Sequence, residues 1–358
     1  MGELELSAGR QRTQPDSILV GLSDFFVDRL RRLYARRRVM VTGAGGFVGG
    51  RLSRALIELG ADVVEVVLAR EPQTSPFARV RTDVRDSAVL RRTISSYQID
   101  TVFHIAGCSL VQASVSDPLN AFGTNAIGTL SVLEAIRQTR PSAVCIVASS
   151  DKAYGDRDLP YRENDPLTPR NIYDASKACG DIIARSYAHS YSMDVRVVRS
   201  SNVYGEGDES STRLIPRTIR ALLDRRSPIV AVIDNLSWRV KMTLRDFVDK
   251  KMTTCVREFV HIDDEARAYL LIADHEMPQT RAVFNVGGTG PMAVSDVIAR
   301  IGAMFVDWDQ TIDVVASVGE IERQYVNAEH LMRTTGWRPL VSLDDGLRRT
   351  CNWIKRCA

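Results

Sequence analysis

The sequence predicts an α/β protein in which a doubly wound parallel sheet is joined to a smaller α/β lobe. From residue 38 to about residue 200, short apolar runs alternate with amphipathic stretches. Connections of this length between the apolar runs indicate parallel strands that are covered by helices on both faces. Beyond residue 200 the alternation is less regular, which indicates a second lobe. The length of 358 residues is that of about two domains.

The N-terminal extension, residues 1–37, precedes this alternation. Residues 1–16 are polar, and from Ser17 onward apolar residues recur at the spacing of an amphipathic helix. The helix ends in a basic stretch with six arginines within residues 29–38. A helix docked on the body of the protein, with a solvated cationic face, is the favoured interpretation. Contact with a membrane surface or a nucleic acid is the alternative.

The larger predicted domain covers residues 38–198, and the second lobe covers mainly residues 199–358. An insert at about 233–256 interrupts the second lobe, and part of 257–270 is a candidate to return to the large sheet. Five apolar runs are the predicted strands of the larger domain: 39–41, 63–68, 101–104, 143–148 and 195–198. Four amphipathic stretches between them are its predicted helices: 50–59, 87–95, 118–138 and 173–191.

The composition is that of an ordinary soluble globular protein, with 44% hydrophobic and 25% charged residues. Lysine plus arginine number 47 against 44 aspartates and glutamates, a balance too weak to argue for a nucleic-acid partner. The longest apolar runs fall far short of the roughly 18 residues of a membrane span, so no membrane partner is expected. Six cysteines without a C-x-x-C pair indicate a reduced, cytoplasmic protein without a metal site.

A glycine-rich turn, TGAGGFVG, follows the first predicted strand and opens a helix. Gly43 permits a tight turn, Gly46 lets the backbone approach a pyrophosphate, and Gly49 lets the helix pack closely on the strand. The N–H groups at the start of the helix, at Phe47 and Val48, would face the anion. The strand, turn and helix together predict a Rossmann-type dinucleotide site.

A second motif, Y-x-x-x-K, places Tyr173 and Lys177 four residues apart in a predicted helix, and therefore on one face of it. A nearby lysine cation is expected to lower the pKa of a tyrosine and make it a usable base. Ser150 lies about 20 residues earlier at the end of a predicted strand, where α/β sheets bind ligands. The three residues predict a catalytic centre.

The glycine turn, the serine and the Y-x-x-x-K motif together resemble the extended short-chain dehydrogenase/reductase family, the NAD-dependent nucleotide-sugar epimerases and dehydratases. The resemblance runs from about Arg38 to Lys355. It implies that a nucleoside-diphosphate sugar and NAD bind between the Rossmann domain and a substrate-binding lobe. It also implies a homodimer formed through the predicted helices 118–138 and 173–191.

The resemblance implies further contacts to the cofactor beside those of Tyr173 and Lys177. The second predicted strand, 63–68, departs from the NAD pattern, because no acidic residue stands at its end. Arg70 stands there instead and could accept a 2′-phosphate, so NADP is the alternative to the favoured NAD. The additional residues implied to contact the cofactor are Asp83, Val84, His104, Ala106, Gly107 and Asn125.

The trio Ser150-Asp151-Lys152 resembles the hydroxyl-Asp-Lys arrangement of CDP-glucose 4,6-dehydratases. That resemblance implies conversion of an NDP-hexose to an NDP-4-keto-6-deoxyhexose with internally recycled NAD. Asp151 would protonate the departing C6 hydroxyl and Lys152 would take the C5 proton. A salt bridge from Lys152 to Asp151 or to a sugar phosphate is the alternative role for the lysine.

Two other functions remain open at this stage. A 4-epimerase would need only Ser150, Tyr173, Lys177 and NAD, since epimerisation has no elimination step. A protein from another class would keep the fold without catalysis and use its basic stretch to bind RNA or a membrane.

The resemblance implies that three residues bind the substrate. Asn202 lies in R-x-x-N-V-Y-G and would contact the sugar or its phosphate. Arg213 is expected to clamp the nucleotide, and Arg257 to hold the diphosphate, which an arginine fork suits well. The insert at 233–256 falls where the base would be contacted, and it is either a lid or a surface addition.

Overall fold

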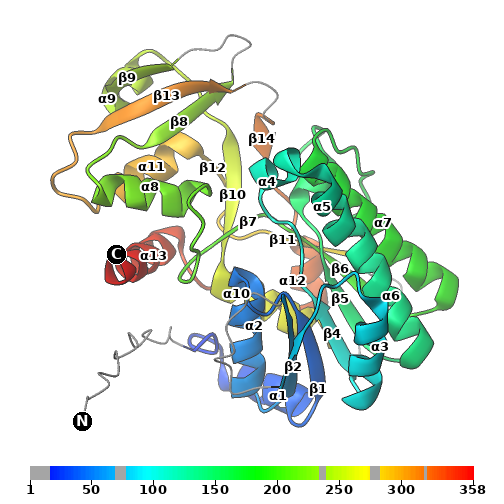
Figure 1. Cartoon of the computed structure of the whole chain (residues 1–358). Coiled ribbons are helices and arrows are strands. Elements are labelled where there is room, and N and C mark those ends of the chain that lie inside the picture. The colour runs from blue at the N-terminus through cyan, green and yellow to red at the C-terminus, as the bar shows by residue number, and fades with distance from the viewer. Residues whose placement is uncertain (1–16, 69–77, 234–238, 275–282, 318–320) are drawn as a thin grey trace, which may run out of the picture.

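The computed structural model describes residues 17–68, 78–233, 239–274, 283–317 and 321–358. Figure 1 shows the larger lobe below the smaller one. The larger lobe contains a seven-stranded sheet in the order β11-β6-β5-β4-β1-β2-β3, in which all neighbours pair in parallel. This order confirms the predicted doubly wound α/β fold. Its strands are β1 (Arg38–Thr42), β2 (Asp62–Val67), β3 (Ala78–Arg81), β4 (Thr101–His104), β5 (Val144–Ala148), β6 (Val195–Ser200) and β11 (Val283–Val286).

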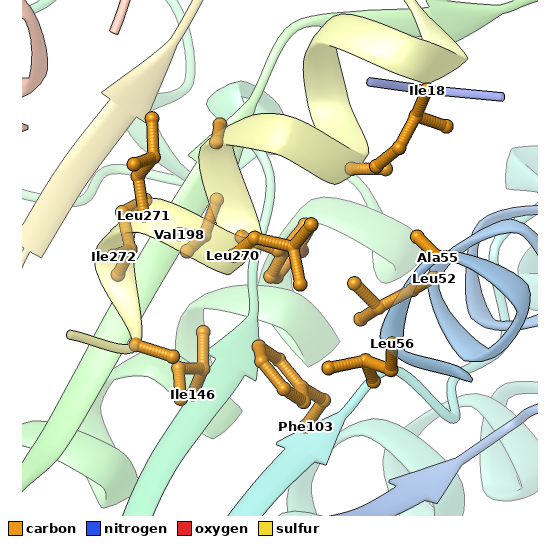
Figure 2. Close-up of a cluster of buried hydrophobic side chains, with 14 of the residues drawn as sticks. Ile18, Leu52, Ala55, Leu56, Phe103, Ile146, Val198, Leu270, Leu271 and Ile272 are labelled. Atoms are coloured by element: carbon orange, nitrogen blue, oxygen red, sulfur yellow. The ribbon is translucent and has the colours of Figure 1, made fainter. Parts of the chain in front are cut away.

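The strands of this sheet are apolar on both faces because helices cover both. Successive residues point to opposite faces, so Val39 and Val41 pack into one hydrophobic cluster and Met40 into another. Figure 2 shows the first cluster, in which Leu56 of α2 faces Phe103 of β4. The first face is covered by α1 (Asp24–Tyr34), α2 (Phe47–Glu58), α10 (Ile262–Ile272) and α12 (Glu329–Thr335). The second is covered by α3 (Ser87–Ser96), α6 (Gly128–Thr139) and α7 (Ile172–Tyr191).

The helix of the N-terminal extension is docked on the larger lobe. It starts at Asp24, later than the apolar spacing predicted. Tyr34 Oη donates a hydrogen bond to the Leu270 carbonyl at 2.7 Å, and Arg29 forms an ion pair with Asp274 at 2.6 Å. Both contacts tie the helix to α10 and the residues just after it, which agrees with the first interpretation of the extension.

The predicted helix 118–138 is not continuous. It begins as α5 (Pro118–Phe122), widens into a π-helical turn over Gly123–Ile127 and continues as α6. Helix α7 approaches this turn so closely that a Cβ atom at Gly180 would lie 2.5 Å from the Asn125 carbonyl oxygen. A glycine is therefore required at this contact. Single π-helical turns often mark functional positions.

The smaller lobe holds two further sheets. In the first, β10 (Val256–His261) pairs with β7 (Asn202–Tyr204), β12 (Pro291–Ala293) and β14 (Arg323–Gln324). In the second, β13 (Thr311–Ser317) lies between β8 (Ile229–Ile233) and β9 (Arg239–Thr243). The accompanying helices are α8 (Leu214–Leu223), α9 (Leu244–Asp249), α11 (Val294–Gly302) and α13 (Leu343–Cys357). Among the residues described, no helix combines the length and the apolar composition needed to cross a membrane.

The range 257–270 divides between the two lobes. Its strand β10 belongs to the smaller lobe, whereas its helix α10 packs on α2 of the larger one. The strand that extends the large sheet beyond β6 is β11, from residues 283–286. The chain therefore crosses between the lobes more than once.

The insert at 233–256 is described from residue 239 onward, and 234–238 lie outside the described residues. Strand β9 pairs antiparallel with β13, and Arg239 Nε donates a hydrogen bond to Asp313 Oδ1 at 2.8 Å. Phe247 of α9 is buried in a cluster with residues of β8 and β13. This part of the insert extends and covers the second small sheet.

Candidate active site

A cavity of about 440 Å³ opens where the carboxyl ends of the large sheet meet the smaller lobe. Its walls come from both lobes, as expected for a ligand site at this end of a doubly wound sheet. None of the insert residues 239–249 contributes to its lining. The sequence-predicted residues that do line it are Phe47, Val48, Ser150, Asp151, Lys152, Tyr173, Lys177, Asn202 and Arg213.

The glycine turn is shaped for close approach of a ligand to the backbone. Gly43 has a φ of +69°, and a Cβ atom there would lie 2.8 Å from Ala106 Cα. A Cβ atom at Gly49 would lie 2.2 Å from the Gly43 carbonyl oxygen. Gly46 caps α2, which begins at Phe47, so the unpaired N–H groups of the helix start face outward. This cradle fits the pyrophosphate of a dinucleotide.

Two of the predicted residues at the end of β4 and in the turn after it, His104 and Ala106, lie behind the lining of the cavity. His104 is buried, with its two ring nitrogens 2.8 Å from Thr42 Oγ1 and 3.1 Å from Thr129 Oγ1. Burial lowers the pKa of His104 to about 3, so the ring is neutral. The backbone N–H of Ala106 donates to Thr42 Oγ1 at 3.2 Å. His104 and Ala106 therefore shape the floor beneath the cavity and do not line it.

Asn125, in the π-helical turn, fastens this same turn to α7. Its Oδ1 accepts from the Cys108 N–H at 2.8 Å, and its Nδ2 donates to the Cys108 carbonyl at 3.1 Å and to Ser176 Oγ at 2.8 Å. A Cβ atom at Gly107 would lie 2.8 Å from Asn125 Oδ1. Asn125 and Gly107 position the wall of the cavity from behind it.

The predicted adenine end lies after β3. The carboxylate of Asp83 accepts hydrogen bonds from Arg85, with an ion pair at 2.6 Å, and this partner lowers the pKa of Asp83. Val84 is buried against Gly128. Glu65 within β2 is engaged by Arg79 at 2.6 Å. Arg70 lies outside the described residues, and the adenine contacts stay a prediction.

Ser150 and Asp151 follow β5 directly, at the start of a 3-10 turn over Asp151–Tyr154. The Ser150 hydroxyl donates to Asp151 Oδ1 at 3.1 Å and accepts from the Lys152 N–H at 3.2 Å. Asp151 is only 2% exposed, and its Oδ2 has no hydrogen-bond partner among the described residues. Burial raises the pKa of Asp151. Burial thus favours the protonated form of this carboxyl, which lines the cavity.

Tyr173 and Lys177 lie on one face of α7, as the motif predicted. Burial raises the pKa of Tyr173 to about 12, against the weaker opposing effect of its hydrogen bond with Ser150. The motif predicted a lower pKa for Tyr173, whereas burial raises it, and the Lys177 ammonium donates a hydrogen bond to the Ala148 carbonyl at 2.5 Å. Burial in turn lowers the pKa of Lys177 to about 8.

Lys152 lines the cavity and is bound to a residue of the smaller lobe. Its Nζ donates a hydrogen bond to Gln324 Oε1 at 3.0 Å. Gln324 is fully buried at the end of β14, where it pairs in register with Arg257 of β10. The lysine is thus held by an uncharged partner, which differs from the salt bridge considered as its alternative role.

The predicted substrate residues do not all reach the cavity. Asn202 lines it and donates to the Glu258 carbonyl at 3.0 Å. Arg213 lines it as well, with an ion pair to Asp208 at 3.0 Å and its guanidinium 5.8 Å from the Phe47 ring centre. Arg257 is buried outside the lining, because its Nη1 folds back onto the Val256 carbonyl at 2.9 Å.

Several lining residues were missed by the sequence reasoning. Glu265 and Tyr269 stand one turn apart on α10, and Ser200 ends β6. One sequence signal could have identified Glu265: it belongs to a run of acidic residues at the start of a helix that is otherwise apolar enough to be buried. In the part of the chain that the structure describes, no three His, Cys, Asp or Glu side chains group as metal ligands. The cavity residues not predicted include Ser109, Ser200, Asp208, Glu265 and Tyr269.

Comparison with known families matches residues 39–287 to the NAD dependent epimerase/dehydratase family, which is more than half of the chain. The matched range runs from β1 to the turn after β11. It therefore includes every strand of the seven-stranded sheet and most of the residues around the cavity.

Individual relatives carry two different activities in their names. The chain is 32% identical over 336 residues to the dTDP-glucose 4,6-dehydratase of Streptomyces griseus, covering 89% of this chain and 94% of that protein. It is 27% identical over 324 residues to a putative UDP-glucose 4-epimerase of Methanocaldococcus jannaschii, covering 88% and 98%. The structure of DesIV, a dTDP-glucose 4,6-dehydratase from Streptomyces venezuelae with NAD and TYD bound, matches with a TM-score of 0.75 at 27% identity, covering 89% and 97%.

Proposed function

The chain belongs to the NAD dependent epimerase/dehydratase family, and on that premise we propose that it is a nucleotide-sugar 4,6-dehydratase. It converts an NDP-hexose to an NDP-4-keto-6-deoxyhexose and recycles its NAD. The observation that carries the proposal is Asp151, a buried carboxyl at the cavity whose pKa is raised by burial and whose Oδ2 has no hydrogen-bond partner among the described residues. An elimination needs such an acid, whereas epimerisation at C4 does not.

The residues present fit NAD. Gly43, Gly46 and Gly49 would hold the pyrophosphate at the start of α2, and Lys177, which lines the same cavity, would contact the nicotinamide ribose. When bound, NAD supplies the group that takes up a hydride from the sugar and later returns it. The mass of the nucleotide released on denaturation checks the choice of cofactor, and recovery of NADP alone would contradict it.

Tyr173 and Ser150 act on the C4 hydroxyl of the sugar. The two side chains share a hydrogen bond and both line the cavity. Because burial raises the pKa of Tyr173 to about 12, the base needs positive charge beside it when substrate is bound. Arg213, whose charge already lowers the pKa of Tyr173, and Lys177 supply cations on this wall of the cavity.

Asp151 and Lys152 carry out the loss of water. The C4 ketone acidifies the C5 proton, which Lys152 accepts. Asp151 gives its proton to the C6 hydroxyl, the C6–O bond breaks, and water leaves with the proton that Asp151 supplied. Gln324 holds Lys152 at the boundary between the lobes, so the base is in place before the substrate arrives.

The double variant Asp151→Asn/Lys152→Ala tests the proposal against epimerisation. Purified protein is given CDP-, dTDP-, GDP- and UDP-sugars, and products are followed by mass for the loss of water. We expect the wild type to dehydrate one of these sugars and the double variant to lose this reaction. Intact turnover of the double variant without loss of water would instead identify a 4-epimerase.

The single variant Lys152→Ala separates the two half-reactions. Oxidation at C4 should still proceed, since Tyr173 and Ser150 are untouched, but elimination should stall. We therefore expect absorbance of reduced nicotinamide to build up on mixing with substrate. Dehydration at the wild-type rate without that absorbance would show that Lys152 is not the base.

We further propose that the enzyme works as a homodimer in the cytoplasm. Apolar side chains are exposed together on α5, the π-helical turn, α6 and α7, elements that contact one another. Leu119 is 87% exposed, and large apolar side chains exposed on elements that pack together are typical of an interface. The six cysteines are free thiols, as in proteins of a reducing compartment. The exposed apolar residues on this face include Leu119, Ile127, Leu130, Ile182 and Tyr191.

A further inference from the structure

The inner end of the cavity contains a carboxyl group that the proposed mechanism does not use. Glu265 of α10 is 1% exposed, yet it lines the cavity. Its Oε1 accepts a hydrogen bond from the Ser200 hydroxyl. Its Oε2 is buried and has no hydrogen-bond partner among the described residues. A buried polar atom without a partner is costly, so this oxygen is expected to meet a ligand.

The chemistry of Glu265 limits what that ligand is. Burial, together with the charges of Asp264 and Asp151, raises the pKa of Glu265 to about 8, against the opposing hydrogen bond from Ser200. The group is therefore mainly protonated at neutral pH and offers both a donor and an acceptor. A carboxamide offers the same pair in reverse order, so the two can form complementary hydrogen bonds.

The strand order places Glu265 at one end of the dinucleotide path. A dinucleotide crosses the carboxyl ends of the strands on either side of the switch point between β1 and β4. Its adenine half lies toward β2 and β3, and its second half toward β4, β5 and β6. Ser200 is the last residue of β6, and Tyr269 lies close enough to Tyr173 for a charge there to raise the pKa of Tyr269. Glu265 is thus near the reacting end.

We propose that Glu265, oriented by Ser200, binds the carboxamide of the nicotinamide ring. This assignment rests on the proposed use of NAD. The contact is a positioning one: it fixes the rotation of the ring about its bond to the ribose, and so determines which ring face points toward Tyr173 and the sugar. Discrimination of this kind follows from a buried polar group that only one orientation of the ring satisfies.

The test compares NAD with ADP-ribose, which has the same adenine, pyrophosphate and ribose groups but lacks nicotinamide. Dissociation constants of both are measured by calorimetry on cofactor-free protein. Glu265→Ala should weaken NAD binding by about tenfold and leave ADP-ribose binding unchanged, because one buried hydrogen-bonded contact is lost. Glu265→Gln should bind NAD within about threefold of the wild type, since its amide keeps a donor and an acceptor.

Two further variants serve as controls. Ser200→Ala removes the group that orients Glu265 and should weaken NAD selectively, by less than Glu265→Ala. Glu258→Ala removes another buried carboxyl, one that accepts from the Val326 N–H outside the cavity lining, and should leave the ratio of the two constants unchanged. Thermal melting confirms that each variant is folded.

The outcomes separate this inference from the proposed function. Equal weakening of NAD and ADP-ribose by Glu265→Ala, or no change in either, would overturn the assignment of Glu265. A loss in Glu265→Gln as large as in Glu265→Ala would also overturn it. A wild type that binds ADP-ribose but not NAD would overturn the proposed function and the assignment together.

Discussion

Burial moves four titratable side chains around the cavity toward their neutral forms. It raises the pKa of Asp151, of Glu265 and of Tyr173, and it lowers the pKa of Lys177. Charge interactions are stronger in such an enclosed space than in water. A charged ligand is therefore expected to shift these ionisations more than it would at the surface.

Tyr173→Phe removes the hydroxyl that we propose as the base. We expect turnover to fall by about 10²–10⁴-fold, while the free energy of unfolding changes by less than ~1 kcal/mol because the ring remains. Tyr154→Phe is the matched control. Its hydroxyl donates to Asn285 Oδ1 and accepts from Arg199, both at 2.8 Å, outside the cavity lining. It should cost ~1–3 kcal/mol of stability and leave turnover of the folded enzyme unchanged.

Glu265 makes the free energy of unfolding depend on pH. Its pKa is about 8 in the folded chain, against an ordinary value of 4.5 for a solvated glutamate, so unfolding releases its proton between these values. The unfolded chain binds fewer protons there, and this group makes the free energy of unfolding fall as pH rises, by at most about 1.4 kcal/mol per pH unit. Glu265→Gln removes the slope.

Urea denaturation of the two proteins across this pH range measures the effect. We subtract the unfolding free energy of the wild type from that of Glu265→Gln. This difference should be smallest near pH 4.5 and should rise with pH until it is largest above pH 8. A difference that does not change with pH would show that Glu265 is ionised when buried.

At the residue scale, spacing alone grouped only those site residues that are close to one another in sequence. Ser150, Asp151 and Lys152 are consecutive, and Tyr173 and Lys177 share one helix face, so their grouping followed from spacing. Gln324 reaches Lys152 only because β14 pairs with β10, and Glu265 reaches the cavity only because α10 packs on α2. Neither arrangement is visible in a local pattern.

At the scale of elements, the helix 118–138 shows how periodicity can conceal a change of winding. The apolar spacing on either side of residues 123–127 fits an α-helix. A single π-helical turn changes this spacing too little to be detected from the sequence. The turn serves to direct Asn125 toward Cys108 while Gly180 packs against its backbone. Both requirements depend on segments that are distant in sequence.

The insert is expected to support the smaller lobe rather than cover the cavity. Phe247→Ala should therefore lower the free energy of unfolding by about 3–5 kcal/mol, because this ring fills the cluster beneath α9. The kcat/KM of the folded fraction should stay at the wild-type value, since residues 239–249 do not line the cavity.

The neighbouring Val248→Ala is the control, because Val248 is 63% exposed and should change stability by less than ~0.5 kcal/mol. Denaturant titration and steady-state kinetics on the same preparations distinguish the two roles. A raised KM with unchanged stability in Phe247→Ala would identify the insert as a lid.

At the scale of the whole molecule, the exposed apolar face predicts self-association. The double variant Leu119→Glu/Ile182→Glu places two charges on this face and should convert a dimer to a monomer. Light scattering measures the mass directly. Val306→Glu is the control, because Val306 is fully exposed in the smaller lobe and its change should leave the dimer intact. A wild-type protein with the mass of one chain would refute the proposed dimer.

The larger lobe was predictable because its strands and helices alternate in sequence, and each shows its own period. The smaller lobe was predictable only as a region. Its second sheet joins β8 and β9 to β13, whose residues are about 70 or more positions later, and short strands with few residues carry little periodicity. The place of β11 in the large sheet was missed for the same reason.

The return of the chain to the large sheet has a consequence for synthesis on the ribosome. The edge of β6 has no strand beside it, and the apolar face under α10 has no cover, until residues 262–286 have been made. An unpaired edge and an uncovered face are what invite aggregation and chaperone binding. After β6 is complete, about 85 further residues must therefore be translated before both α10 and β11 can pack on the larger lobe, although the Y-x-x-x-K motif emerges much earlier.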